Sequence, residues 1–503
     1  MTIDYLQANQ PDILEVIANL SSDEVFTPPR VANAVLDLLP PEVWVDPTLR
    51  WLDPGCKTGI FPREITKRLM VGLADAIPDE TQRLNHILTK MVFAVAITEL
   101  TGMMSRRTLY CSKDASGEFS TVQFEKPSGN IWHQRLEHSY DDKGRCTECG
   151  GTRQQLEGVG RDNNAYGFVH AEGQKKIEKE LGMKFDVIVG NPPYQMEDSG
   201  NKASSSPLYN VFVDQAKSLN PRYLAMIIPS RWFAGGKGLD AFRSNMLTDQ
   251  RIRTLVDFTD ASALFPGVDI AGGVCYFLWE SESSGPCHVE TNHAGKRTES
   301  IRFLNEYPTF IRFAEAIPII EKIRAKSSVF YDSVVSSRKP FGLDTTTKPT
   351  KVGDLTLYWR DGRGPIERDR IVAGHDLISK WKAITSYISY DHAGQHDKDG
   401  ARRVLSKLDV IGPNEVCSET YLVLSSHDTK EQAEAVIAFF RTRFARFLIS
   451  LVSYTQHITK DRFAYVPVMS SDRTWTDKDL YGFFGLTTSE STFIETMIKE
   501  MPA

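Results

Sequence analysis

One short turn contains residues that could, by their type and spacing, support a chemical reaction. Asn191, Pro192, Pro193 and Tyr194 directly follow the apolar run Phe185–Gly190. Two adjacent prolines end a strand and hold the chain extended and rigid. The side-chain oxygen of Asn191 and the carbonyl of Pro192 can accept hydrogen bonds from an amine, and Tyr194 offers a flat face for a base. Because accepting these protons localises the lone pair of an exocyclic amine, the turn predicts group transfer to such an amine. The alternative is a plain strand-ending turn.

A second turn could hold a cofactor. Asp53–Gly59 (Asp-Pro-Gly-Cys-Lys-Thr-Gly) follows the short run Leu49–Leu52 and precedes a predicted helix that starts near Phe61. A glycine-containing turn between a strand and a helix lets a ligand approach the backbone closely. The G-x-G-x-x-G fingerprint is absent, so the turn is not a dinucleotide site of that type. A simple strand-to-helix connection is the alternative.

A pair of cysteines at C-x-x-C spacing predicts a metal site. Two further ligands would complete a tetrahedral zinc site, which is structural because four protein ligands leave no open position. The surrounding segment has few apolar residues for a core of its own, and a metal would supply that stability. His133 is the alternative histidine, and reduced cysteines in a loop are the alternative to a metal. The expected ligands are Cys111, His138, Cys146 and Cys149.

The elements that must position these residues alternate between strands and helices over the first 280 residues. Runs that are apolar throughout predict strands buried on both faces, and helices between them predict an open, doubly wound α/β sheet. The strongest such runs are Met91–Thr98, Phe185–Gly190, Tyr223–Pro229 and Gly273–Trp279.

Changes in composition divide the chain into two domains. Residues 1–325 form the predicted catalytic domain, in which residues 109–162 are interpreted as a polar insertion that contains the cysteine pair. Residues 326–503 form a second region of mixed α and β structure. It contains a long helix predicted from about Thr429 to Ser453, with Asp428 and Glu431 spaced as a capping box.

Composition limits the classes of protein. The chain has 503 residues, of which 41% are hydrophobic and 25% charged, as in globular proteins. No apolar run is long enough to cross a membrane, the N-terminus does not resemble a signal peptide, and seven cysteines argue against a disulfide framework. We therefore expect no membrane partner and a cytoplasmic protein of a bacterial or phage-infected cell. The net charge of −6 argues against nonspecific coating of DNA.

Taken together, the motifs resemble the amino-methyltransferases of restriction–modification systems. An Asp-Pro-x-x-x-x-Gly-x-Phe turn from Asp53 precedes the Asn-Pro-Pro-Tyr turn, and an F-T-P segment precedes both. This order is that of the gamma class of N6-adenine DNA methyltransferases. The resemblance implies a Rossmann-like S-adenosylmethionine-dependent catalytic sheet, with a target-recognition domain after it. The F-T-P residues are Phe26, Thr27 and Pro28.

The resemblance also implies roles for single residues. Asp53, Gly55 and Gly59 would line the S-adenosylmethionine pocket, Phe26, Thr27 and Pro28 would hold the methionine part of the cofactor, and Glu99 would bind the ribose hydroxyls. Two features depart from the family. Lys57 stands where a glycine is usual, and Glu99 lies farther along the chain than the roughly 20 residues expected between the glycine turn and the acidic residue.

The same resemblance implies a flipped adenine in double-stranded DNA. A base inside a duplex must rotate into the pocket, where Tyr194 and Phe265 would stack on it; a core aromatic is the alternative for Phe265. Phosphate contacts would come from Lys and Arg between about residues 326 and 467, including Arg402, Arg403 and Arg446. A separate restriction nuclease or specificity partner would fit this setting. The alternatives are an RNA or protein-amide methyltransferase, and a non-catalytic binding protein.

Overall fold

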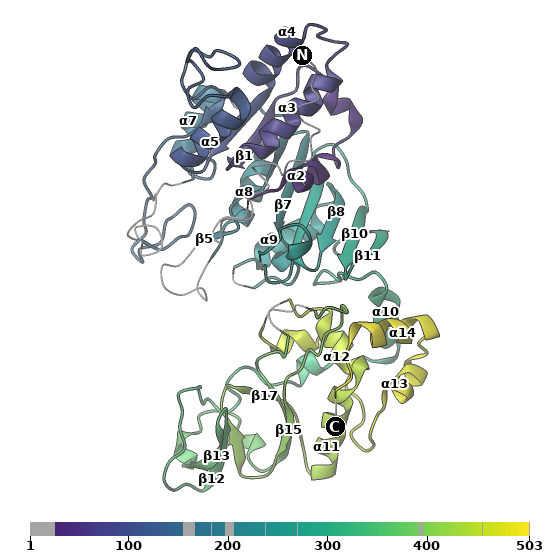
Figure 1. Ribbon diagram of the computed structural model, residues 1–503. Helices are drawn as coiled ribbons and strands as arrows, with labels where there is room; N and C mark the ends of the chain where they lie inside the picture. The colour runs from purple at the N-terminus through teal and green to yellow at the C-terminus, as the bar shows by residue number, and fades with distance from the viewer. Residues whose placement is uncertain are drawn as a thin grey trace. The chain divides into compact units, whose positions relative to one another are not determined.

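The structure is a computed structural model of the chain. It describes residues 26–153, 166–182, 184–196, 206–236, 238–268, 270–391, 396–454 and 456–501. Residues 154–162 of the predicted insertion therefore lie outside the described residues. The chain divides into two compact units (Figure 1). The first comprises residues up to Glu290 together with Glu299–Glu306, and the second comprises Thr291–Thr298 and Tyr307–Ala503.

A nine-stranded sheet forms the centre of the first unit. The strand order is β11-β10-β8-β9-β7-β4-β1-β2-β3. The five strands β3, β2, β1, β4 and β7 are parallel, and β9 is inserted antiparallel between β7 and β8. The strands are β1 (Trp51–Cys56), β2 (Val92–Ala96), β3 (Ile131–Trp132), β4 (Val187–Gly190), β7 (Tyr223–Pro229), β8 (Ile252–Phe258), β9 (Val274–Glu280), β10 (Cys287–His293) and β11 (Lys296–Arg302). The predicted α/β sheet and its four strongest strands are thus present.

Helices connect the parallel strands and cover the sheet (Figure 1). The chain runs from β1 outward to β2 and β3, then returns to the other side of β1 for β4 and β7. This reversal makes β1 and β4 a topological switch point, where ligands bind in open α/β sheets. The helices of this unit are α2 (Pro29–Leu36), α3 (Ile60–Gly72), α4 (Glu80–His86), α5 (Glu99–Tyr110), α7 (Ala171–Leu181), α8 (Tyr209–Ser218) and α9 (Asp240–Thr248).

The predicted insertion begins later than residue 109. Ile131 and Trp132 form β3, which pairs with β2 at the edge of the main sheet. Tyr110 and Val122 belong to the same hydrophobic core as the sheet. The apolar side chains of residues 109–132 are few and widely spaced along the chain, so the sequence alone did not indicate this packing.

The second unit contains two small sheets and a helical core. Its first helix, α10, contributes Ile319, Ile320 and Ile323 to that core, so the change between units falls at Glu306, earlier than the predicted residue 325. The remaining elements are β12 (Leu355–Trp359), β13 (Gly362–Ile366), β14 (Trp381–Ser386), β15 (Leu408–Ile411), β16 (Glu415–Cys417), β17 (Tyr421–His427), α10 (Ala316–Lys326), α11 (Lys430–Arg441), α12 (Arg443–Ser450), α13 (Asp477–Phe484) and α14 (Thr488–Met497).

The long helix predicted near residue 440 is two helices. Thr442 ends α11 and caps α12, because its hydroxyl accepts a hydrogen bond from the amide of Ala445. The cap at the start of α11 is Thr429 rather than Asp428. Within the described part of the chain, no helix is both long and apolar enough to cross a membrane.

Candidate active site

The two predicted turns meet at the switch point of the sheet. Asp53 lies in β1, and Asn191 directly follows β4, its parallel neighbour. A Cβ on Gly55 would lie 3.6 Å from both Pro192 Cα and Pro193 Cδ, so the two turns lie side by side. Gly190 permits this approach, because a Cβ there would lie 2.8 Å from the carboxylate of Asp53.

Helix α5 holds the cofactor turn in place. The hydroxyl of Ser105 donates a hydrogen bond of 3.2 Å to the carbonyl of Lys57, and the hydroxyl of Thr108 donates one of 2.7 Å to the carbonyl of Thr58. Gly59 has a φ of +76°, and a Cβ at this position would lie 3.0 Å from Ser105 Cα. The turn therefore requires glycine at position 59, because α5 packs directly against it.

The carboxyl group of Asp53 is buried beside this turn. Burial raises its pKa to about 7, although the amide of Gly55 and the charge of Lys57 act in the opposite direction. The amide of Gly55 donates a hydrogen bond of 3.2 Å to Asp53 Oδ1. Lys57, which stands where the family usually has glycine, is itself buried and so places a positive charge near this carboxyl group.

The F-T-P segment contacts the catalytic turn. Thr27 and Asn191 are both buried, and Asn191 Nδ2 donates a hydrogen bond of 3.0 Å to Thr27 Oγ1. Pro28 is also buried and precedes α2, while Phe26 is partly exposed. The structure thus gives Thr27 a direct contact with the predicted catalytic side chain, which the sequence did not indicate.

Tyr194 is partly exposed, but its hydroxyl is buried. Burial raises the pKa of this phenol well above its ordinary value; the neighbouring Cys275 acts in the same direction, and a hydrogen bond with Asn191 opposes it. The ring packs against the core of the first unit. Directly after it, Gln195–Met196 (β5) pairs with Ser206–Pro207 (β6) in a short antiparallel ladder.

Glu99 lies at the same edge of the sheet as Asp53. It is the first residue of α5, it follows β2 after Ile97 and Thr98, and it is exposed. Thr98 caps this helix and forms a capping box with Thr101. The carboxylate therefore projects from a fixed helix start beside the carboxyl end of β1.

The structure does not support Phe265 as a stacking residue. Its side chain is 2% exposed and belongs to the hydrophobic core of the first unit. The neighbouring carbonyls of Ala263 and Leu264 accept hydrogen bonds from Arg30, which fixes this segment against α2. A ring enclosed in this way has no open face for a base, so the core alternative is the better interpretation.

A buried polar pair at the same end of the sheet as Asn191 was not predicted from the sequence. The hydroxyl of Ser230 donates a hydrogen bond of 2.7 Å to the carboxylate of Asp257, and both side chains are fully buried. Ser230 follows β7 and Asp257 lies near the end of β8. The apolar residues before Asp257 indicate a buried strand. A carboxylate within such a strand is unusual, and this is the signal that could have pointed to Asp257.

Three of the four predicted metal ligands lie together in the structure, and the fourth does not. Ligand atoms of His138, Cys146, Cys149 and His170 all lie within 4.8 Å of one another, and Cys111 is not in this group. Cys111 is exposed and ends α5. His170 was missed because it lies beyond the predicted insertion, although it is the next histidine after the cysteine pair.

Comparison with known proteins identifies the family. A model of the Eco57I restriction-modification methylases matches residues 90–265, which include the turn after β4. A relative from Mycoplasma pneumoniae (strain ATCC 29342 / M129 / Subtype 1), named an uncharacterized adenine-specific methylase, is 36% identical over 322 residues, covering 58% of this chain and 76% of the relative. The chain belongs to the Eco57I family of restriction-modification methylases. The predicted family is confirmed.

Solved structures show looser likenesses to this Eco57I-family methylase. The Type IIL restriction-modification enzyme MmeI in complex with DNA is 10% identical with a TM-score of 0.45, covering 92% of this chain and 66% of that chain. A nuclease-deletion mutant of the Type ISP enzyme LlaGI is 11% identical with a TM-score of 0.46, covering 88% and 52%. The methylase spans 49% of a modification subunit from Vibrio vulnificus YJ016, at 15% identity and a TM-score of 0.33.

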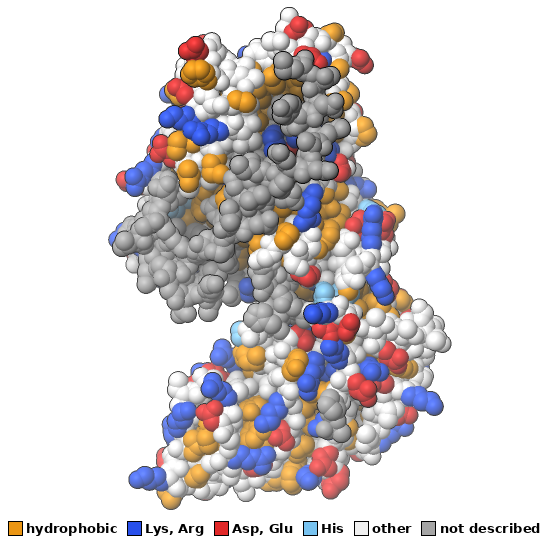
Figure 2. Space-filling model, in the orientation of Figure 1, with side chains coloured by type: hydrophobic (Ala, Val, Ile, Leu, Met, Phe, Trp, Pro, Cys, Tyr) orange, Lys and Arg blue, Asp and Glu red, His pale blue; other side chains and the backbone are white. Residues whose placement is uncertain are grey.

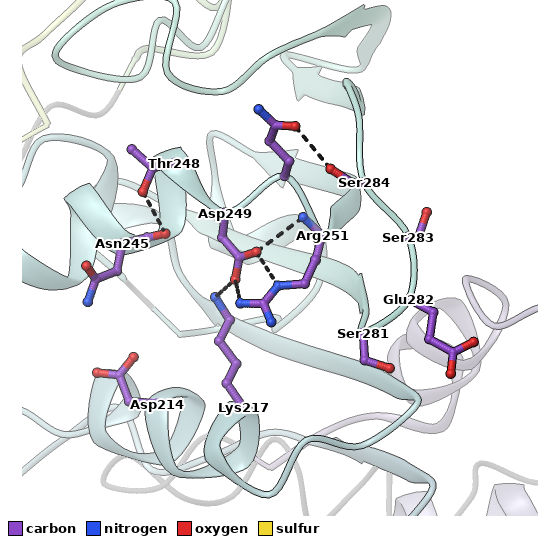
Figure 3. Close-up of a pocket in the computed structure, with 11 residues that line it drawn as sticks. Asp214, Lys217, Asn245, Thr248, Asp249, Arg251, Ser281, Glu282, Ser283 and Ser284 are labelled. Carbon is purple, nitrogen blue, oxygen red and sulfur yellow. Dashed lines mark hydrogen bonds and ion pairs between the residues drawn. The ribbon is translucent and has the colours of Figure 1, made fainter.

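Figure 3 shows a surface pocket in the first unit of the methylase. Asp249 forms ion pairs with Lys217 at 3.0 Å and with Arg251 at 2.7 Å, and Trp279 donates a hydrogen bond to it. Asp249 and Arg251 precede β8, Lys217 lies near the end of α8, and Trp279 lies near the end of β9. The pocket therefore lies at the end of the sheet opposite to Asn191. Because the charges at its centre already pair with one another, we interpret these residues as a structural ion-pair network.

On the visible face of the methylase, basic residues are dispersed. Figure 2 shows Lys and Arg side chains interspersed with Asp and Glu over the described part of the visible face. Two arginines expected to contact phosphates are buried instead. Arg402 pairs with Asp391 and donates to the carbonyl of Ser450, and Arg446 donates to main-chain carbonyls, including that of Arg403. Both therefore stabilise the second unit.

Proposed function

We propose that this methylase moves a methyl group from S-adenosylmethionine to the N6 amino group of an adenine in double-stranded DNA, at specific sites. The observation that carries the proposal is the close approach of two turns at the switch point, where the Asn-Pro-Pro-Tyr turn after β4 lies beside Gly55 near the end of β1. Membership of the Eco57I family supports adenine-specific methylation in a restriction–modification setting. The enzyme is an adenine-specific DNA methyltransferase.

The residues around the first turn fit S-adenosylmethionine. Asp53 supplies a buried carboxyl group suited to a cationic ligand, and the turn that ends at Gly59 exposes backbone for close approach. Glu99 provides an exposed carboxylate at the end of the neighbouring strand, which suits the ribose hydroxyls. Phe26 and Pro28 lie in the segment that also contacts Asn191. When bound, the cofactor supplies a methyl group activated by its sulfonium charge.

The catalytic turn positions the amine. Asn191 Oδ1 and the carbonyl of Pro192 accept its two N–H groups, which localises the lone pair on nitrogen. Pro193 keeps this pair of acceptors rigid, and Tyr194 stacks on the base after it has rotated out of the duplex. The amine proton passes to solvent after transfer, so no strong base is needed.

The second unit would read the DNA target. Its exposed basic side chains would contact phosphates; Lys348 and Arg360 are examples, both at the surface beside Asp361, whereas Arg402 and Arg446 are buried. A separate restriction nuclease or specificity partner would complete a restriction–modification system.

The decisive experiment is transfer of labelled methyl groups. The full chain is incubated with tritiated S-adenosylmethionine and unmethylated duplex DNA, beside Asn191→Ala and the matched control Asn245→Ala at the opposite sheet edge. We expect N6-methyladenine from the wild type and the control, and a fall of about 100-fold or more for Asn191→Ala. Label that enters RNA or protein but not DNA would support the alternative substrates. Label in DNA that persists in Asn191→Ala would refute the catalytic assignment.

A further inference from the structure

Four side chains between residues 138 and 170 converge with the spacing of a tetrahedral metal site. His138 Nδ1 lies 3.6 Å from Cys149 Sγ, and His170 Nε2 lies 3.5 Å from Cys146 Sγ. All four ligand atoms lie within 4.8 Å of one another. In a tetrahedral zinc site with Zn–S of about 2.3 Å and Zn–N of about 2.0–2.1 Å, neighbouring sulfur and nitrogen atoms lie about 3.5 Å apart. The two distances therefore match that geometry.

The surrounding hydrogen bonds orient these side chains for one ion. His170 Nδ1 is hydrogen-bonded to the carbonyl of Tyr166 at 2.8 Å, which leaves Nε2 directed at the cluster. The amide of Cys146 donates to the carbonyl of Gly151 at 2.7 Å, and the amide of Gly150 donates to the carbonyl of Cys146 at 2.9 Å. These bonds hold the C-x-x-C turn closed around the two sulfur atoms.

We propose that His138, Cys146, Cys149 and His170 bind one structural Zn²⁺, which anchors the wall of the cofactor turn. On binding, the two thiols release their protons to solvent, and the two thiolates neutralise the charge of the ion. Cys146, Cys149 and His170 are buried, so a neutral site avoids an uncompensated charge in the interior. Four protein ligands leave no position for a substrate or water, so the role is structural.

The ligands connect the cluster to the active site through packed side chains. Between the two cysteines, Glu148 accepts a hydrogen bond from the amide of Ala171 and so caps α7. Four and two residues before His170, the rings of Tyr166 and Phe168 pack against Phe212 of α8, with centroids 5.8 Å and 5.7 Å away.

Phe212 in turn supports the cofactor turn. A Cβ on Gly55 would lie 3.7 Å from Phe212 Cε1, so this ring forms a wall beside Gly55. The aromatic segment before His170 is therefore one layer removed from the cofactor turn. Loss of the ion would release that segment and weaken the support of Phe212.

Metal analysis of the full chain tests the ligand set. We expect about one zinc per wild-type chain and about one for Cys111→Ser, but close to none for Cys146→Ser or His170→Gln. Protein stripped of zinc and reloaded with Co²⁺ under reducing conditions should show the intense visible bands and thiolate charge-transfer bands of a four-coordinate S₂N₂ site. The proposal is overturned if the reloaded wild type holds neither metal, if its thiols are oxidised to a disulfide in the native protein, or if Cys111→Ser loses the ion.

Amide hydrogen exchange tests the anchoring role without an activity measurement. Removal of zinc from the wild type should accelerate exchange of residues 166–181 by about tenfold or more, and leave α9 unchanged. Equal exchange of residues 166–181 with and without zinc would overturn the anchoring role. A methylase that lacks methyl transfer but still binds one zinc would contradict only the proposed function, so the two failures are distinguishable.

Discussion

The carboxamide of Asn191 donates a hydrogen bond of 3.0 Å to the hydroxyl of Thr27, across 164 positions of sequence. The nitrogen is directed at the hydroxyl, so the oxygen, which is the acceptor, occupies the other end. A rotated carboxamide would present N–H donors to an amine that itself must donate, and the pair would repel.

Thr27 should therefore act as a positioning residue. Replacing it by valine keeps the shape of the side chain but removes the acceptor, and we expect kcat to fall by about 10- to 100-fold with little change in the Kd of S-adenosylmethionine. Thr27→Ser should restore most of the activity. Steady-state kinetics and equilibrium binding would measure both quantities. An equal loss of cofactor affinity would instead show that Thr27 acts on the cofactor, as the family resemblance implies.

The raised pKa of Asp53 predicts a pH dependence of cofactor binding. Burial moves this pKa to about 7, so the carboxylate fraction grows as the pH rises through neutrality. Because S-adenosylmethionine is cationic, its affinity should increase by about tenfold between about pH 6 and about pH 8. Isothermal titration of the wild type and Asp53→Asn would check this. A variant with the same pH profile as the wild type would exclude Asp53 as its origin.

Two aromatic residues should respond differently to the loss of their rings. Tyr194→Leu should lower kcat by about tenfold or more, because a stacking surface for the base is removed. Phe265→Leu should leave kcat nearly unchanged and instead lower the thermal midpoint, since Phe265 is a core residue. The reverse result would restore Phe265 as the stacking residue. Methyl-transfer kinetics and calorimetry on the same preparations distinguish these effects.

The Asp249 ion pairs should stabilise the first unit. Burial alone would raise the pKa of Asp249, but hydrogen bonds from Arg251 and Lys217 hold it below its ordinary value. Because the pKa of Asp249 is lower in the folded than in the unfolded protein, its carboxylate stabilises the fold at pH values above the unfolded pKa of about 3.9. This contribution is lost as the pH falls from that value towards the folded-state pKa. Asp249→Asn should cost about 2 kcal/mol at neutral pH, less than a fully buried pair.

The calorimetric transition of the first unit would measure this cost. Asp240→Asn breaks an exposed pair with Arg243 and serves as the control, with an expected change under about 0.5 kcal/mol. The difference between wild type and Asp249→Asn should shrink below about pH 4. A difference that grows there would show that the ion pairs are not its source.

The sequence predicted the features that depend on local order. Phe185–Gly190 is apolar and ends at two prolines, so a buried strand followed by a rigid turn was predictable, and the observed strand is Val187–Gly190. The glycine turn after Trp51 was predictable for the same reason. The strand order that brings Asp53 beside Asn191 follows from family resemblance and crossover rules rather than from either motif alone.

Features that depend on distant contacts were missed. His170 joins the cysteine pair only because the chain returns to it before α7, and no local spacing marks that return. An arginine such as Arg446 is a common phosphate ligand, but here its guanidinium group donates hydrogen bonds to the carbonyls of Arg441 at the end of α11 and of Arg403. Phe265 matched a motif position, but its burial is decided by packing against α2.

The hairpin of β10 and β11 has a further consequence for protein engineering. Its tip, Thr291–Thr298, belongs to the second unit although both of its flanks belong to the first. The boundary is therefore crossed three times by the backbone, and neither unit is one uninterrupted stretch of chain. A chimera that exchanges the second unit between relatives would have to graft two separate segments, because a single splice after Glu306 would leave the hairpin tip of one parent with the remainder of the other.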